Sequence, residues 1–334
     1  MKRLTMLLIL LYSAVAFSQG SKPLYQQTAK WTIGGEGGWD YLTLSPNSDR
    51  LFIAHTNKIE VIDTSNGKVI GEVPANGAHG IAIVPEKNLG FSTNGRAGTV
   101  TVFHLDTLKP ETDIKVGENP DAIIYDEHSK HVIVMNGRSK DLMAIDPSTS
   151  KVVATVPLGG KLEFAAADAG HVYVNVEDLG EIAVVNTKTW TADQKWKLNG
   201  CEEPSGLALD TKQDVLFSVC GNKVMIVVGT KDGKQLATLP TGSGTDAANF
   251  DPGLKRVFAS NGEGTLTVIQ ESKGGKYDVL GNVDSARGAR TMALDPRTHK
   301  IYLATAELGP PAEGQRRPSI KPGTFMVLVY SPVQ

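Results

Sequence analysis

The sequence predicts an all-β protein, a seven-bladed β-propeller whose blades are four-stranded antiparallel sheets. Short runs of alternating apolar and polar residues, separated by Gly, Asp, Asn and Lys, recur along the chain and indicate strands and turns. Four such runs form a unit that repeats at roughly 40 residues, most clearly in residues 201–242, and this period is typical of propeller blades. A single run at residues 25–35 has no partner of its own, whereas the last unit lacks a fourth run.

The units follow one another without a break. They begin near Trp39, Ala78, Pro120, Leu162, Cys201, Thr245 and Ala289. The fourth is the most degenerate, because it lacks the Asn-Gly turn and the GTVTV-like run. Because the seventh unit ends at its third strand, we expect residues 25–35 to supply the missing outer strand and close the ring. Closure of this kind removes exposed sheet edges, which would otherwise favour aggregation.

The N-terminus has the pattern of a secretory signal. Lys2 and Arg3 precede an apolar run that ends at Phe17 among small residues, and the run is too short for a permanent membrane span. We predict cleavage after Ser18, or alternatively after Ala16. The expected organisation is a signal peptide at residues 1–18 and one propeller domain at residues 19–334, periplasmic or secreted and monomeric.

The two cysteines, Cys201 and Cys220, lie in the fifth unit, the first just before its first strand and the second at the end of its second strand. An antiparallel hairpin brings them to one edge, so we predict a disulfide, which an exported chain permits. Two buried free thiols are the alternative, and a soft-metal site is disfavoured because no CxxC accompanies them. The formal net charge of −2 and the absence of a basic block give no reason to expect a nucleic-acid partner.

Recurring motifs connect these units to a known family. GxAxxP, VFxxNG and GTVTVxD patterns, or close variants of them, appear in HGIAIVP, TNGRAGTVTVFHLD, MNGRSKDLMAID and FASNGEGTLTVI, and a closing TVPxG appears in VVATVPLG. The mature chain thereby resembles the bacterial YVTN-repeat family, whose exported members include YncE-like propellers. The resemblance implies a seven-bladed propeller without an agreed reaction, and a fold alone does not define a function.

Strand geometry predicts which residues surround the axial opening, or mouth, of the ring. The first strand of each unit is innermost, so the residue before its small or apolar start should line the mouth. These positions are Asp40, His79, Asp121, Glu163, Ser205, Asp246 and Arg290. The second strands end on the same face, at His55, Asn94, Asn136, Asn175, Cys220, Asn261 and Thr305. For the asparagines, ligand contacts and hydrogen bonds to turn backbone remain open alternatives.

The predicted mouth is acidic. Four carboxylates need a compensating cation, raised pKa values or wide separation, and Arg290 supplies one counter-charge. The Pro-rich insert at residues 307–323 of the last blade starts on this face, and we predict a lid from which Arg316 and Arg317 reach the carboxylates.

The chemistry of the mouth is less determined. His55 and His79 next to Asp40 would permit a metal site of mixed nitrogen and oxygen ligands or a general acid/base pair. Because a histidine at a loop edge is more often a hydrogen-bonding residue, we predict no metal and no cofactor.

Three functions of different classes remain. No catalytic triad, zinc-protease, haem or dinucleotide motif occurs in the sequence. The preferred prediction is a binding module that holds a small polar or cationic ligand, or a partner segment, in the mouth. The alternatives are a lactonase-like hydrolase or isomerase using the same residues, and a protein-interaction scaffold with an inert mouth.

Overall fold

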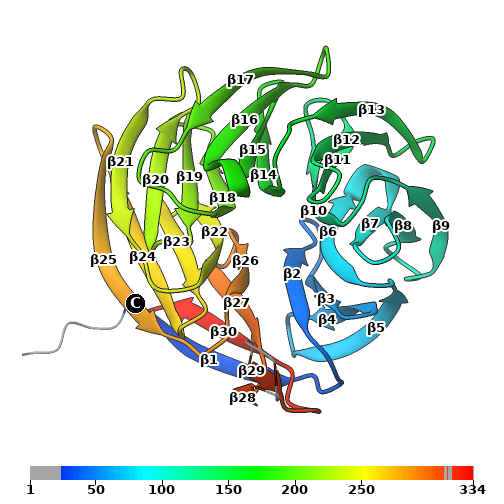
Figure 1. Ribbon diagram of the computed structural model, residues 1–334. Coiled ribbons are helices and arrows are strands. Elements are labelled where there is room, and N and C mark those ends of the chain that lie inside the picture. Colours follow the sequence, from blue (N-terminus) through cyan, green and yellow to red (C-terminus); the bar gives the residue numbers. More distant parts are fainter. Residues whose placement is uncertain (1–23, 312–313, 315–317, 334) are drawn as a thin grey trace, which may run out of the picture.

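The computed structural model describes residues 24–311, 314 and 318–333 and forms a ring of seven four-stranded antiparallel sheets around a central opening (Figure 1). The predicted fold class is confirmed. In blades 1 to 6 the strand that comes first along the chain is innermost and the next strands follow outward in order, whereas in blade 7 β26 is innermost and β1 is outermost. The inner strands β2, β6, β10, β14, β18, β22 and β26 surround the opening (Figure 1).

The first four blades are regular. Blade 1 consists of β2 (Trp39–Leu44), β3 (Arg50–His55), β4 (Lys58–Asp63) and β5 (Lys68–Pro74). Blade 2 consists of β6 (Ala78–Val84), β7 (Leu89–Asn94), β8 (Thr99–His104) and β9 (Pro110–Lys115). Blade 3 consists of β10 (Pro120–Asp126), β11 (His131–Asn136), β12 (Asp141–Asp146) and β13 (Lys151–Pro157). Blade 4 consists of β14 (Leu162–Asp168), β15 (His171–Val176), β16 (Glu181–Asn186) and β17 (Thr191–Lys197).

The last three blades complete the ring. Blade 5 consists of β18 (Pro204–Asp210), β19 (Val215–Cys220), β20 (Val224–Gly229) and β21 (Gln235–Pro240). Blade 6 consists of β22 (Thr245–Asp251), β23 (Arg256–Asn261), β24 (Thr265–Ser272) and β25 (Lys276–Asp284). Blade 7 consists of β26 (Thr291–Asp295), β27 (Lys300–Thr305), β30 (Met326–Pro332) and β1 (Tyr25–Thr32). Two short 3₁₀ turns, η1 (Pro85–Lys87) and η2 (Glu177–Leu179), lie in blades 2 and 4.

The N-terminal strand closes the ring, as the sequence predicts. β1 pairs antiparallel with β30 from Tyr25 opposite Pro332 to Thr32 opposite Met326. Tyr25 is buried and packs edge-on against Phe258 of blade 6, with ring centroids 5.3 Å apart. The two ends of the chain therefore share one sheet, and the first strand also ties that sheet to its neighbour.

The core lies in layers between adjacent blades. One such layer joins Phe52 and Ile59 of blade 1 to Ile81 and Phe103 of blade 2, all buried. Period-two alternation along the strands produces these layers, because both faces of a central strand in a propeller blade meet a neighbouring blade. The outermost strands are different: β5, for example, is exposed along most of its length.

The insert in blade 7 contains two short paired strands, β28 (Leu308–Pro311) and β29 (Pro318–Ile320). Ile320 approaches Gly38, and Leu308 approaches Gly288. Both glycines lie two residues before mouth positions, so the described part of the insert packs beside the mouth. Arg316 and Arg317, the predicted lid residues, lie outside the described residues, and so do the predicted signal peptide and its cleavage site.

Candidate functional site: the axial mouth

A repeated irregularity turns one set of side chains toward the axis. In blades 1 to 6 the pairing between first and second strands shifts register next to the predicted mouth position, as between Trp39 and Leu42 or between Pro120 and Ile123. Such a bulge interrupts the alternation of a strand and re-aims its side chains. The motif that repeats in the sequence therefore repeats as a local backbone feature, and it places the predicted residues around one opening.

Three of the predicted residues meet on neighbouring blades. Nδ1 of His79 on β6 lies 2.6 Å from Oδ2 of Asp40 on β2 and 3.7 Å from Oδ1 of Asp121 on β10. All three side chains are half-buried. Their potential metal-ligating atoms lie within 4.8 Å of one another. No other group of three or more His, Cys, Asp or Glu side chains among the described residues meets this condition.

The electrostatics of this cluster follow from its crowding. The hydrogen bond to Asp40 raises the pKa of His79, and the charge of Asp121 acts in the same direction. Burial, followed by the charge of Asp40, raises the pKa of Asp121 to about 6. No hydrogen bond to the Asp121 carboxylate is found among the described residues, so its charge is balanced mainly by His79.

The other mouth charges have partners of their own. Arg290, before β26, forms an ion pair with Asp246 on β22. Nζ of Lys161 lies 2.7 Å from Glu163 and also contacts Glu177. Burial raises the pKa of Glu163, and Glu177 and Asp121 add to that shift. Lys161 and Arg290 are therefore engaged by other acidic side chains, and their charges lower the pKa of Asp121 less than His79 does.

Two aromatic rings from different blades meet next to the mouth residues. Tyr41 on blade 1 and Phe164 on blade 4 follow mouth residues directly in sequence, and their ring centroids lie 5.2 Å apart. A channel cavity of about 220 Å³ extends along the inner strands and is lined by Tyr41, Phe164, small residues such as Gly80 and Gly206, and aliphatic side chains such as Met292. Burial raises the pKa of Tyr41, and the charges of Asp121, Glu163 and Asp40 contribute, which places its phenol within the field of the mouth.

Two predicted mouth residues, Ser205 and His55, make contacts with other residues of the protein. Ser205 donates a hydrogen bond of 3.3 Å to the carbonyl of Thr245 on the next blade. His55 differs from expectation, because it is buried away from the opening. Its Nδ1 faces Glu60 at 3.2 Å and its ring lies 4.2 Å from that of Phe325. The physical reason is its place at the end of the second strand, one strand farther from the axis than Trp39, with which it pairs.

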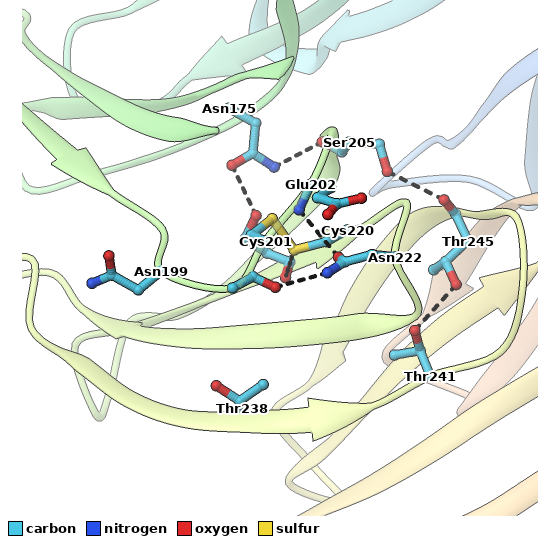
Figure 2. The surroundings of a disulfide bond; sticks show 12 residues. Asn175, Asn199, Cys201, Glu202, Ser205, Cys220, Asn222, Thr238, Thr241 and Thr245 are labelled. Atoms are coloured by element: carbon cyan, nitrogen blue, oxygen red, sulfur yellow. Dashed lines mark hydrogen bonds between the residues drawn. A yellow bond between two sulfur atoms is a disulfide. The ribbon is translucent and has the colours of Figure 1, made fainter. Parts of the chain in front are cut away.

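The asparagines at the same level support the backbone and neighbouring hydroxyls. Asn94 donates to Thr99 and Thr101, and Asn261 donates to Thr265 and Thr267, all at 2.8–3.0 Å. In blade 4, Asn175 instead donates across the blade junction to the carbonyl of Ser205 (Figure 2). These side chains are buried, and their amide groups donate hydrogen bonds within the protein, although Oδ1 of Asn94 and Oδ1 of Asn136 have no partner among the described residues.

The predicted disulfide is present. Cys201 and Cys220 are bonded (Figure 2), with Cα atoms 5.5 Å apart. Pro204 is the strand partner of Cys220. Asn222 fixes the loop before β18, since it accepts from the backbone of Glu202 and donates to the carbonyl of Gly200. A disulfide is compatible with an oxidising, exported location. None of the helices in the described residues is long and apolar enough to cross a membrane.

Solved structures share this architecture. Kuenenia stuttgartiensis hydrazine synthase matches with a TM-score of 0.70 and 17% identity, over 82% of this chain and 94% of that chain. The structure of U3-55K matches with a TM-score of 0.76 and 11% identity, over 93% and 100%. The WD40 repeats of RRP9 match with a TM-score of 0.74 and 11% identity, over 92% and 100%. The likeness is one of fold.

At these identities the comparisons establish the seven-bladed propeller and leave its chemistry open. No protein-family model matches the sequence. No curated protein matches it either.

Proposed function

We propose that this protein is an exported binding module, a YncE-like member of the YVTN-repeat family, whose mouth holds a small ligand that carries positive charge. The resemblance of its repeat motifs supports the family, and the N-terminal signal pattern together with the disulfide supports export. Propellers commonly use the axial opening to bind partners or small molecules.

The uneven distribution of charge in the mouth is the observation that supports a positively charged ligand. Asp121 is half-buried beside a second carboxylate, Asp40, while Arg290 and Lys161 are engaged by other acidic side chains. The raised pKa of Asp121 means that ionisation of this carboxyl, buried beside Asp40, costs more free energy than it does in water. A cationic ligand removes this penalty, whereas an anionic ligand increases it.

The size of the channel cavity supports a small ligand in preference to a threaded chain. The Tyr41 and Phe164 rings, from blades 1 and 4, lie 5.2 Å apart and line a channel cavity of about 220 Å³, which suits a small guest. The rings also offer an aromatic surface on which an organic cation is favourably held.

Calorimetric titration tests the proposal. We expect spermidine and arginine amide to bind the EDTA-dialysed protein with heat that falls as salt is added, and glutarate of similar size not to bind. Asp121→Asn should weaken binding at least about tenfold, because a half-buried charge pair contributes roughly 1.4 kcal/mol or more. Asp193→Asn, an exposed change on the outermost strand β17, is the matched control and should bind as the unmodified protein does.

Absence of binding by both cations, or equal binding of the anion, would overturn the proposal and leave the scaffold alternative. In that case the outer blade surfaces become the place to search, where Val69, Ile70, Val153 and Leu236 are exposed on outer strands.

One observation favours the enzymatic alternative. The 2.6 Å contact between His79 and Asp40 has the geometry in which a carboxylate orients an imidazole for general acid/base work. A lactonase-like hydrolase or isomerase would use His79 in this way. Turnover of a lactone series that is abolished by His79→Gln and preserved in His299→Gln would establish it, since His299 forms a similar pair with Asp251 outside the mouth.

A further inference from the structure

The Asp40, His79 and Asp121 group has the composition of a metal site. Its donor atoms are two carboxylate oxygens and one imidazole nitrogen, and they lie within 4.8 Å of one another. The three residues come from the inner strands of three consecutive blades, β2, β6 and β10, which are held together by a continuous core. Convergence of donors from rigid, separate elements is what a preformed metal site requires.

We propose that this group binds one divalent transition-metal ion, with Zn²⁺ preferred, through Nδ1 of His79 and one carboxylate oxygen from each of Asp40 and Asp121. The inference deepens the proposed function, because the ion would be the cation for which the mouth is charged. This proposal differs from the prediction from sequence, in which the mouth holds no metal. That prediction rests on His55 and His79 next to Asp40 and does not include Asp121 as a ligand.

The distances suit an ion of this size after small side-chain rotations. Zinc is bound at about 2.0–2.2 Å by nitrogen and oxygen, so two ligand atoms of a tetrahedral site lie about 3.3 Å apart. The observed separations from His79 Nδ1, 2.6 Å to Asp40 and 3.7 Å to Asp121, lie on either side of that value. An ion between the three atoms would lengthen the first separation and shorten the second.

Charge balance supports the same ion. Two carboxylates and a neutral imidazole carry a charge of −2, which a divalent ion neutralises. Without the ion, a proton on Nδ1 of His79 would occupy the same place, in the 2.6 Å contact with Asp40. The donor set favours Zn²⁺ over Mn²⁺, and it disfavours Mg²⁺ and Ca²⁺, which prefer oxygen ligands alone.

The rest of the imidazole is packed so that Nδ1 faces the carboxylates. A methyl group on Gly95 would lie 2.6 Å from Nε2 of His79 and 3.2 Å from Oδ1 of Asn119, so the far edge of the ring fits against the Gly95 backbone. Three protein ligands leave a coordination position for water or for a ligand, which distinguishes such a site from a closed structural one.

A second His/Asp pair in the same chain provides the control. Nδ1 of His299 lies 2.7 Å from Asp251, close to the His79 and Asp40 distance, and the side chain has a similar exposed fraction. No third ligating residue joins that pair in the described part of the chain. Any binding that arises from surface histidines or from a generic His/Asp pair would therefore persist in His79→Gln and fall in His299→Gln.

The experiment is calorimetric titration of ZnCl₂ into the EDTA-dialysed full chain, repeated with MnCl₂ and CaCl₂. We expect about one Zn²⁺ per chain, weaker Mn²⁺ and no Ca²⁺ at the same concentrations. His79→Gln and Asp121→Asn should each weaken Zn²⁺ binding at least about tenfold, since even outer contacts of metal sites change affinity by 10–100-fold. His299→Gln should bind as the unmodified protein does. Circular dichroism spectra of all variants check that the propeller is retained.

Two results would overturn the inference: no saturable Zn²⁺ binding, or saturable binding that both mouth variants retain. The spermidine titration in EDTA separates this failure from failure of the proposed function. Organic-cation binding without Zn²⁺ binding rejects the metal site and keeps the binding module. Loss of both rejects both.

Discussion

The rings of Tyr41 and Phe164 meet near the axis of the propeller, 5.2 Å from centroid to centroid, although the two residues lie 123 positions apart in the chain. Each follows a mouth residue directly, whereas the corresponding positions on the other blades hold Gly80, Ala122, Gly206, Ala247 and Thr291. Two large side chains among five small ones thus fill the centre of the ring. The charged mouth residues thus lie next to a channel that Tyr41, Phe164, small residues and aliphatic side chains line.

Removal of one of the two aromatic rings should destabilise the protein. Phe164→Ala enlarges the channel cavity and deprives Tyr41 of its stacking partner, and we expect a loss of about 2–4 kcal/mol in the free energy of unfolding. Phe164→Leu keeps most of the volume and should cost about 1 kcal/mol. Urea titrations followed by circular dichroism measure both values. Equal stability of the alanine variant and the unmodified protein would show that the ring pair does not support the centre.

Small residues on the inner strands are required by the approach of neighbouring backbones. A methyl group on Gly206 of β18 would lie 2.6 Å from the amide of Ala248 and from the carbonyl of Asp246 on β22. Backbone atoms cannot move aside as a flexible side chain can. We therefore expect Gly206→Ala to destabilise the protein by about 1–3 kcal/mol through overpacking at the junction of blades 5 and 6.

Gly229, at the end of β20 in the same blade, is the matched control. The nearest atom to an added methyl group there is 3.6 Å away, an ordinary contact, and the residue does not need a positive φ. Gly229→Ala should leave the thermal midpoint within a few degrees of the original or raise it. A similar loss in both variants would mean that glycine flexibility, and not the blade junction, determines the effect.

Much of this architecture could be predicted from the sequence because equivalent residues recur at the same place in each repeat. Once residues 201–242 define four strands, the unit places Asp40, His79, Asp121 and Asp246 at equivalent points of an inner strand. The missing final strand and the N-terminal run predict closure, which the pairing of β1 with β30 confirms. The disulfide could be predicted for the same reason, since the hairpin register brings Cys201 and Cys220 to one edge.

Contacts between blades could not be predicted, because they depend on the radius of the ring and on how each bulge turns its side chain. The sequence places His55 and His79 equally close to Asp40, but only His79 contacts it, while His55 is buried against Phe325. The approach of Asp121 to His79 is likewise a matter of neighbouring blades. No linear pattern in the chain encodes it.

Reduction of the disulfide should lower stability without opening the ring. The bond links residues 19 positions apart and lies in blade 5, away from the closing sheet of blade 7. Loops of this size correspond to about 3 kcal/mol of stabilisation in the chain-entropy view. A Cys201→Ser, Cys220→Ser double variant should therefore unfold at lower urea concentration while its far-ultraviolet spectrum is retained. An unchanged midpoint would indicate that the loop before β18 is ordered without the bond, for instance by Asn222.

A buried carboxyl pair between blades 5 and 6 makes stability depend on pH. Glu271 on β24 and Asp210 on β18 are both buried. Burial, followed by the hydrogen bond and the charge of Asp210, raises the pKa of Glu271 from 4.5 to about 7. A carboxyl whose pKa is higher in the folded state binds its proton more tightly there. Its contribution to stability is therefore greatest at low pH and declines as the pH rises from about 4.5 to about 7.

Glu271→Gln removes this ionisation and keeps the shape of the side chain. At pH 8 we expect the variant to be more stable than the unmodified protein by about 1–2 kcal/mol, because the unmodified chain must then bury the ionised carboxylate of Glu271. At pH 4.5 the two should differ little, since Glu271 is then protonated. Urea unfolding at both pH values measures the difference, and the exposed change Glu127→Gln controls for the loss of one acidic residue. A variant that is less stable at pH 8 would show that the Glu271 carboxylate is stabilising when ionised and that the two acids do not share a proton.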